Sequence, residues 1–145
     1  MGTKSARHIL EAILASYLTA QTELTGVNIY TGDSADTNVL PKAIVLCDSA
    51  RTPNDLPDGL GNYACSVRIT LFDSADDVTL TAHRARVAAI AGAMQDLTAI
   101  KAAFVSGGDA LCYDVTTVSE DEGVNERSWA SVLSYQVLIV VNPVA

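Results

Sequence analysis

The longest regular pattern of hydrophobic and polar positions runs from residue 63 to residue 94. Residues 63–72 alternate, which predicts a strand whose apolar side carries Tyr63, Cys65, Val67, Ile69 and Leu71. Ser74 and Asp77 then stand at capping-box spacing, so we expect a helix to begin there. The apolar stripe of that helix comprises Leu80, Val87, Ile90, Ala91 and Met94. This pattern predicts a strand followed directly by a helix that covers a sheet.

The N-terminal third of the chain predicts one helix and two strands. Helical spacing of apolar residues places the helix at Ser5–Glu23, with Thr3 or Ser5 as its N-cap. A short strand is expected at Val27–Tyr30. A second strand at Lys42–Cys47 is an almost continuous apolar run, which predicts that both of its faces are buried.

The C-terminal half predicts a short helix and two long strands. Asp96 is the expected cap of a helix at Leu97–Phe104, which two glycines follow. Strands are expected at Ala110–Val118 and Ser128–Val141, separated by a polar turn over residues 119–125. The last strand is apolar on both faces, so it needs helices on one side and another partner on the other.

The order of these elements indicates the fold class. It reads α-β-β-β-α-α-β-β, without an internal repeat. Gly92 lies in a patch of small residues on the second helix, which would allow close approach of another backbone. The sequence therefore predicts one α+β domain over residues 1–145: one mixed or antiparallel sheet of about five strands, with two to three helices packed mainly on one face.

Composition disfavours several classes of function. A net charge of −8 with nine scattered basic residues disfavours general affinity for a nucleic-acid backbone. The longest apolar run, Val137–Val141, is far shorter than the roughly 20 residues of a membrane-spanning helix. Residues 1–8 lack the apolar core of a secretion signal. Three separated cysteines, Cys47, Cys65 and Cys112, predict buried, reduced thiols rather than a zinc site or a disulfide framework.

Candidate chemistry is sparse. Neither His8 nor His83 has an acidic residue or cysteine at the i+4 spacing of a helical metal pair, and no Gly-x-Ser-x-Gly motif is present. One acidic group matches no calcium loop and comprises Asp33, Asp36 and Asp48. A second is interpreted as helix capping and comprises Asp73, Asp76 and Asp77. We therefore expect no catalytic residue, no cofactor and no metal site.

Segments spread over nearly the whole chain carry a resemblance to a known family. After the opening helix these are Val27–Gly32, Leu40–Leu46 and Tyr63–Asp73. Helices containing His83–Val87 and Leu97–Ile100 follow, and then a long closing strand with Trp129 and Tyr135. In this order of parts, from Ile9 to Val141, the chain resembles the tail terminator (tail-completion) proteins of long-tailed bacteriophages and related head–tail joining, or neck, proteins.

The resemblance implies a structural virion protein of the tail or neck, assembled in the host cytoplasm. It implies a homo-oligomeric ring, most often hexameric, that caps the tail tube, ends its polymerisation and joins it to the head-side connector. The implied partners are the tail tube protein, a connector or neck protein and, in a contractile tail, the sheath protein. DNA would pass through the lumen without specific binding, and no membrane is involved.

Polar loops at strand ends are the expected docking segments of such a ring, at residues 33–38, 51–61 and 120–127. The candidate docking residues are Asp33, Asp36, Asn38, Arg51, Asn54, Asp58, Glu120, Asp121, Glu122, Glu126 and Arg127. Two alternatives remain open. One is another phage neck protein, such as a connector stopper. The other is a small bacterial ligand- or peptide-binding module, which would need a closed pocket with converging polar groups.

Overall fold

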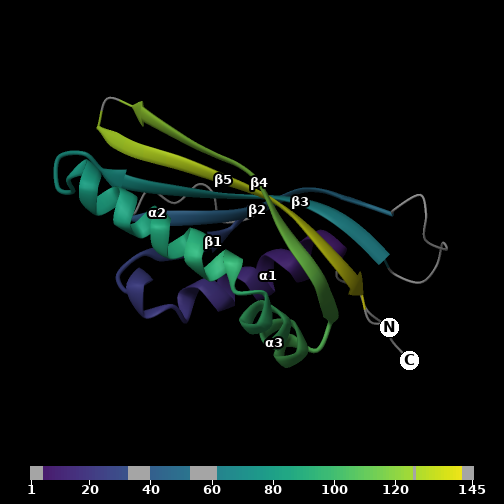
Figure 1. The fold of residues 1–145 in the computed structure, drawn as a ribbon. Helices are drawn as coiled ribbons and strands as arrows, with labels where there is room; N and C mark the ends of the chain where they lie inside the picture. Colours follow the sequence, from purple (N-terminus) through teal and green to yellow (C-terminus); the bar gives the residue numbers. More distant parts are fainter. Residues whose placement is uncertain (1–4, 33–39, 53–61, 126, 142–145) are drawn as a thin grey trace.

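A computed structural model describes residues 5–32, 40–52, 62–125 and 127–141 of the chain. Its five strands form one open, mixed sheet in the order β1-β2-β3-β5-β4. Only β1 and β2 are parallel, and the other neighbouring strands are antiparallel. Figure 1 shows the three α-helices on the same side of this sheet. The predicted α+β class, with helices on one face of a five-stranded sheet, is confirmed.

The elements follow the predicted order, with an added turn of 3-10 helix after the first helix. In chain order they are α1 (Ala6–Thr19), η1 (Thr22–Leu24), β1 (Asn28–Thr31), β2 (Lys42–Arg51), β3 (Asn62–Ser74), α2 (Leu80–Gln95), α3 (Leu97–Gly107), β4 (Ala110–Asn125) and β5 (Ser128–Val141). The first helix is shorter than predicted, because α1 ends at Thr19 instead of continuing to Glu23.

Each α-helix begins at a side chain that accepts a hydrogen bond from a backbone amide of its first turn. Ser5 caps α1 and Asp96 caps α3, as predicted. The predicted start of α2 is wrong. Ser74 still belongs to β3, and the Thr79 hydroxyl accepts from the Ala82 amide at 3.1 Å to begin the helix at Leu80.

The predicted polar turn at 119–125 is also wrong, because β4 continues through this segment. Glu120, Asp121 and Glu122 pair in register with Leu133, Val132 and Ser131 of β5. An acidic run is unfavourable in an isolated strand, but the apolar partner strand supplies a backbone ladder along its whole length. The third candidate docking segment is thus mostly the outer strand of a hairpin rather than a loop.

The core lies between the helices and one face of the sheet. Alternate positions of β3 and β5 point into it, as the period of 2 predicts, and they include Cys65, Val67, Ile69, Leu71, Leu133, Tyr135, Val137 and Ile139. Helix side chains pack against them, including Leu10, Leu14, Leu18, Ile90, Met94, Ile100 and Phe104. In β2 only Ala43, Val45 and Cys47 are fully buried, so the expected burial of both faces is wrong.

Candidate functional site

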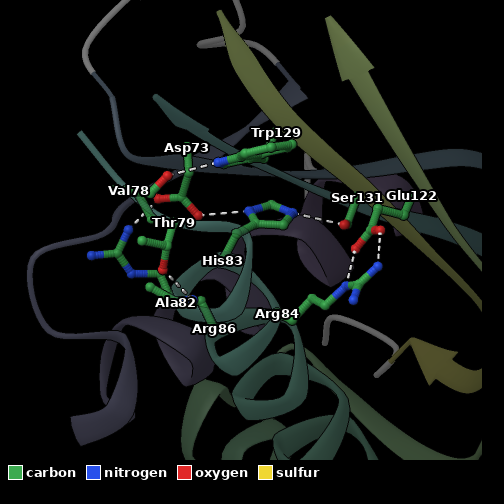
Figure 2. A network of polar contacts seen from close by, with 10 residues as sticks. All are labelled: Asp73, Val78, Thr79, Ala82, His83, Arg84, Arg86, Glu122, Trp129 and Ser131. Carbon is green, nitrogen blue, oxygen red and sulfur yellow. Dashed lines mark hydrogen bonds and ion pairs between the residues drawn. The ribbon is translucent and has the colours of Figure 1, made fainter. Parts of the chain in front are cut away.

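A buried polar network joins β3, α2 and β5 beneath the sheet. Asp73 Oδ2 lies 2.7 Å from His83 Nδ1, and His83 Nε2 lies 2.8 Å from Ser131 Oγ (Figure 2). Asp73 and His83 are fully buried and Ser131 is 1% exposed. A neutral imidazole that donates Nδ1–H to the carboxylate accepts the serine hydroxyl at Nε2. Three side chains that are far apart in the sequence thereby satisfy one another.

Two further contacts hold the turn between β3 and α2. Arg86, one turn along α2 from His83, donates through Nη1 to the other oxygen of Asp73. The Trp129 Nε1–H donates to the Val78 carbonyl at 2.7 Å (Figure 2). Among the described residues, no buried side-chain nitrogen or oxygen lacks a partner. The network is therefore fully satisfied, which makes it a source of stability rather than of strain.

The same order of carboxylate, imidazole and hydroxyl forms the catalytic triad of serine hydrolases, which also need an oxyanion hole and an accessible serine. Ser131 lies within β5, which is paired on both sides, so its backbone amide is committed to the ladder and cannot stabilise an oxyanion. Ser131 is 1% exposed where it lines the adjacent groove, its hydroxyl is bound to His83, and Asp73 is shared with Arg86. The arrangement fixes α2 against the sheet and is not built for acyl transfer.

An open groove of about 450 Å³ lies next to the network, between α2 and the second half of β4. Its walls include small residues of α2, among them Ala88, Ala91 and Gly92. At its mouth Arg84 makes two hydrogen bonds to Glu122, at 2.9 and 2.7 Å. The Arg84 guanidinium lowers the pKa of the Glu122 carboxyl. Both side chains lie on the surface, so the pair orders the rim of the groove and contributes little stability.

Gly92 has open space around it rather than a close neighbour. A Cβ placed there would have no non-local atom within 4 Å in the part of the chain that the structure describes. The patch of small residues therefore leaves room for a close approach, and no non-local atom of the described chain fills it.

A second buried carboxylate anchors α1 to β2. Glu11 Oε2 accepts from the Cys47 amide at 2.8 Å, and Arg7 Nε donates to the Cys47 carbonyl at 2.9 Å. The ladder between β2 and β3 shifts register just after Cys47, so these side chains replace partners that a regular ladder would supply. Glu11 and Arg7 also line an open pocket of about 250 Å³, whose other walls are Ser5, His8, Gly32 and Leu46.

The three cysteines are free and buried in strands, as predicted. A hydrogen bond between the thiols of Cys65 and Cys47 raises the pKa of Cys65 and lowers that of Cys47. Burial raises the pKa of the Cys112 thiol to about 11. Within the described residues, no group of three His, Cys, Asp or Glu side chains is arranged to hold a metal ion.

The predicted docking residues are only partly described, and those that are do not gather at one place. Arg51 ends β2 opposite Ala64 at the start of β3, whereas the Arg127 carbonyl accepts from the Ala75 amide just beyond the other end of β3. The acidic positions of the third segment lie in β4, and Glu122 is the one that binds Arg84. Outside the described residues lie Asp33, Asp36, Asn38, Asn54, Asp58 and Glu126.

Sequence reasoning missed the network, although two signals for it were present. Asp73 continues the alternation of residues 63–71, which points its side chain into the core, but we interpreted it as a capping residue. His83 falls on the apolar stripe of α2, one turn before Val87. The capping interpretation of Asp73 is therefore wrong: its carboxylate binds His83 and Arg86 inside the fold.

The described helices do not individually have the length and apolar composition needed to cross a bilayer; α2 and α3 reach that threshold only as a pair, across a bend of 73°. No protein-family profile matches the chain, and no curated protein matches it either.

Proposed function

We propose that this protein is a structural component of a bacteriophage tail or neck, forming a homo-oligomeric ring, of the tail terminator type, that caps the tail tube and joins it to the head-side connector. One observation carries the proposal. The face of the sheet opposite the helices is apolar along several strands, and no described helix covers it (Figure 1).

The uncovered face has the composition of a contact surface. Its half-buried apolar side chains come from β2, β3 and β5 and include Ile44, Leu46, Phe72, Val132, Leu138 and Val140. Polar groups lie among them: on the central strand β3, the Arg68 guanidinium makes two bonds to Asp48, at 2.7 and 2.8 Å, and Lys42 Nζ lies 5.2 Å from the centre of the Phe72 ring. Such a mixture of apolar and polar side chains is the composition of a non-obligate protein–protein interface.

Ring formation also accounts for the charge and for the lack of an accessible catalytic group in the described chain. In a ring each subunit presents two different patches to its neighbours, so apolar area outside the helix-covered core is expected. A net charge of −8 disfavours adhesion of DNA that passes through the lumen. His83 and Asp73 contribute to neither role, because the fold encloses them completely.

The direct test combines sedimentation velocity with negative-stain images, using the protein alone and with tubes assembled from the tube protein encoded beside its gene. We expect rings with a DNA-wide hole, or single rings bound at tube ends that stop tube growth. Leu138→Asp on the uncovered face should abolish tube-end binding. Val105→Asp, at an α3 position that is 65% exposed, should leave it intact. A protein that stays monomeric and never binds a tube end overturns the proposal.

A further inference from the structure

The outer edge of β4 is the most exposed apolar feature of the described chain. Among the described residues, six large hydrophobic side chains are exposed. Four of them belong to β4: Leu111 at 43%, Tyr113 at 51%, Val118 at 66% and Val124 at 67%. As a terminal strand of the sheet, β4 pairs only with β5. About half of its backbone N–H and C=O groups therefore point away from the sheet, available to another strand.

Two bulges interrupt this edge. The ladder between β4 and β5 shifts between Cys112 and Asp114 and again between Thr117 and Ser119. Monomeric proteins prevent pairing at such edges with bulges, lysine, proline or inward-pointing charges. Here the residues at the two shifts are Tyr113 and Val118, both large and more than half exposed. Between them lies a regular segment of four residues, Asp114–Thr117.

The opposite edge of the same sheet matches this regular segment in length. It is formed by β1, also four residues long and paired only with β2. β4 carries Asp114, Glu120, Asp121 and Glu122 and no lysine or arginine. β1 carries no charged residue, and Lys42 of β2 lies directly behind its Asn28.

We propose that β4 of one copy pairs with the β1 edge of the next copy, through Asp114–Thr117 and Asn28–Thr31, so that the sheets of successive subunits join edge to edge. This inference rests on the proposed ring and identifies the contact between its subunits. The contact is heterologous, since each copy uses β4 on one side and β1 on the other, and such contacts form a ring when the rotation from copy to copy closes. Pairing β4 with β4 would instead place the two acidic strands side by side.

The occupant is a strand rather than a small ligand or a helix. Backbone groups along β4 provide the hydrogen bonds, as in recognition by strand addition. Tyr113 and Val118 border the paired segment and become buried when the neighbour docks. The acidic strand β4 then lies beside an edge that carries no acidic side chain and is backed by Lys42, which favours head-to-tail order over the pairing of two β4 strands.

The experiment compares wild type with Val118→Lys and Val105→Lys, two substitutions of equally exposed valines on different elements. Sedimentation over a range of concentrations measures self-association, and thermal unfolding of each variant verifies that it is folded. We expect Val118→Lys to weaken association at least about tenfold, because it adds a charged side chain where the neighbour packs. Val105→Lys should associate like wild type.

Hydrogen exchange of the wild-type oligomer identifies the paired strands. Amides in Asp114–Thr117 and in Asn28–Thr31 should both exchange more slowly on association. Slower exchange in β4 alone overturns the head-to-tail pairing in favour of a twofold dimer. Association that Val118→Lys leaves unchanged overturns the edge contact while rings and tube-end binding still support the proposed function. A wild type that never self-associates overturns the edge contact, and tube-end binding then decides the proposed function separately.

Discussion

The two sides of the sheet differ in how far the chain satisfies its own groups. On the helix-covered side a buried carboxylate, imidazole and hydroxyl bind one another. Large apolar side chains on this side are buried as well, and Leu133 is only 1% exposed. On the other side Leu138 is half-buried, and at the β4 edge Val118 remains 66% exposed.

The helix-covered side stabilises the fold, whereas the uncovered face and the β4 edge are available for contact with partners. Burial of apolar area and paired polar groups stabilises the covered side without any second molecule. The uncovered face and edge keep apolar area in water, where a partner would gain free energy by covering it. Mutations on the covered side should therefore change stability, and mutations on the other side should change association.

The largest effect is expected from Asp73→Ala. The substitution leaves the buried His83 without its carboxylate partner and releases Arg86. Breaking a buried charged contact from one side costs about 3–5 kcal/mol of unfolding free energy. Chemical denaturation followed by circular dichroism measures it.

Asp77→Ala is the matched control, because this exposed acid lies in the turn that follows β3 and was expected to cap α2. It should change the free energy by less than about 0.5 kcal/mol. Equal losses for the two variants would mean that the turn, rather than the buried network, supplies the stability.

The next prediction compares two leucines of β5 that point to opposite faces. Leu133→Ala removes a core side chain and should cost about 2–5 kcal/mol. Leu138→Ala, on the uncovered face, should cost about 1 kcal/mol in the isolated protein, because the side chain is only half-buried. Denaturation of both variants at low protein concentration tests this, and a larger loss for Leu138→Ala would contradict the assignment of faces.

Alkaline pH should weaken the covered side through Tyr135. Burial, with a smaller contribution from Glu120, raises the pKa of Tyr135 to about 12 from an ordinary value near 10. The unfolded chain therefore releases this proton first. The corresponding stability is present below pH 10 and is lost as the pH rises from about 10 to about 12.

Tyr135→Phe isolates this contribution. Between pH 8.5 and pH 11 the wild type should lose about 1.4 kcal/mol more unfolding free energy than the variant. Cys112, whose pKa is also raised, adds the same trend to both proteins and cancels in the difference. Parallel pH profiles for the two proteins would show that Tyr135 does not ionise differently on folding.

The smallest effect is a stabilisation. Gly92→Ala in the exposed wall of the groove should raise the unfolding free energy by about 0.5–1 kcal/mol, because alanine favours the helix and its methyl group meets open space. Gly108→Ala is the control with the opposite sign, since Gly108 has φ of +80°, which disfavours a side chain. Thermal unfolding compares the two. A destabilising Gly92→Ala would indicate that a neighbour occupies the groove.

Local patterns predicted the fold well where neighbouring residues decide the structure. The alternation of β3 and the caps Ser5 and Asp96 depend on interactions within a few residues, and all were confirmed. The acidic residues 119–125 were misinterpreted because their strand conformation comes from pairing with β5, which composition does not reveal. Asp73 was misinterpreted for a related reason: β3 continues through it because Trp129 of β5 lies opposite.

By itself the sequence determined the class of the fold, the order of its elements and the apolar side of β3. Only the tertiary structure decided that Asp73, His83 and Ser131 meet, since His83 and Ser131 are 48 residues apart in the chain. It also decided that β4 is a terminal strand whose outer edge is open. Side-chain period and capping are local properties of a chain, whereas strand neighbours and buried partners are set by how distant segments pack together.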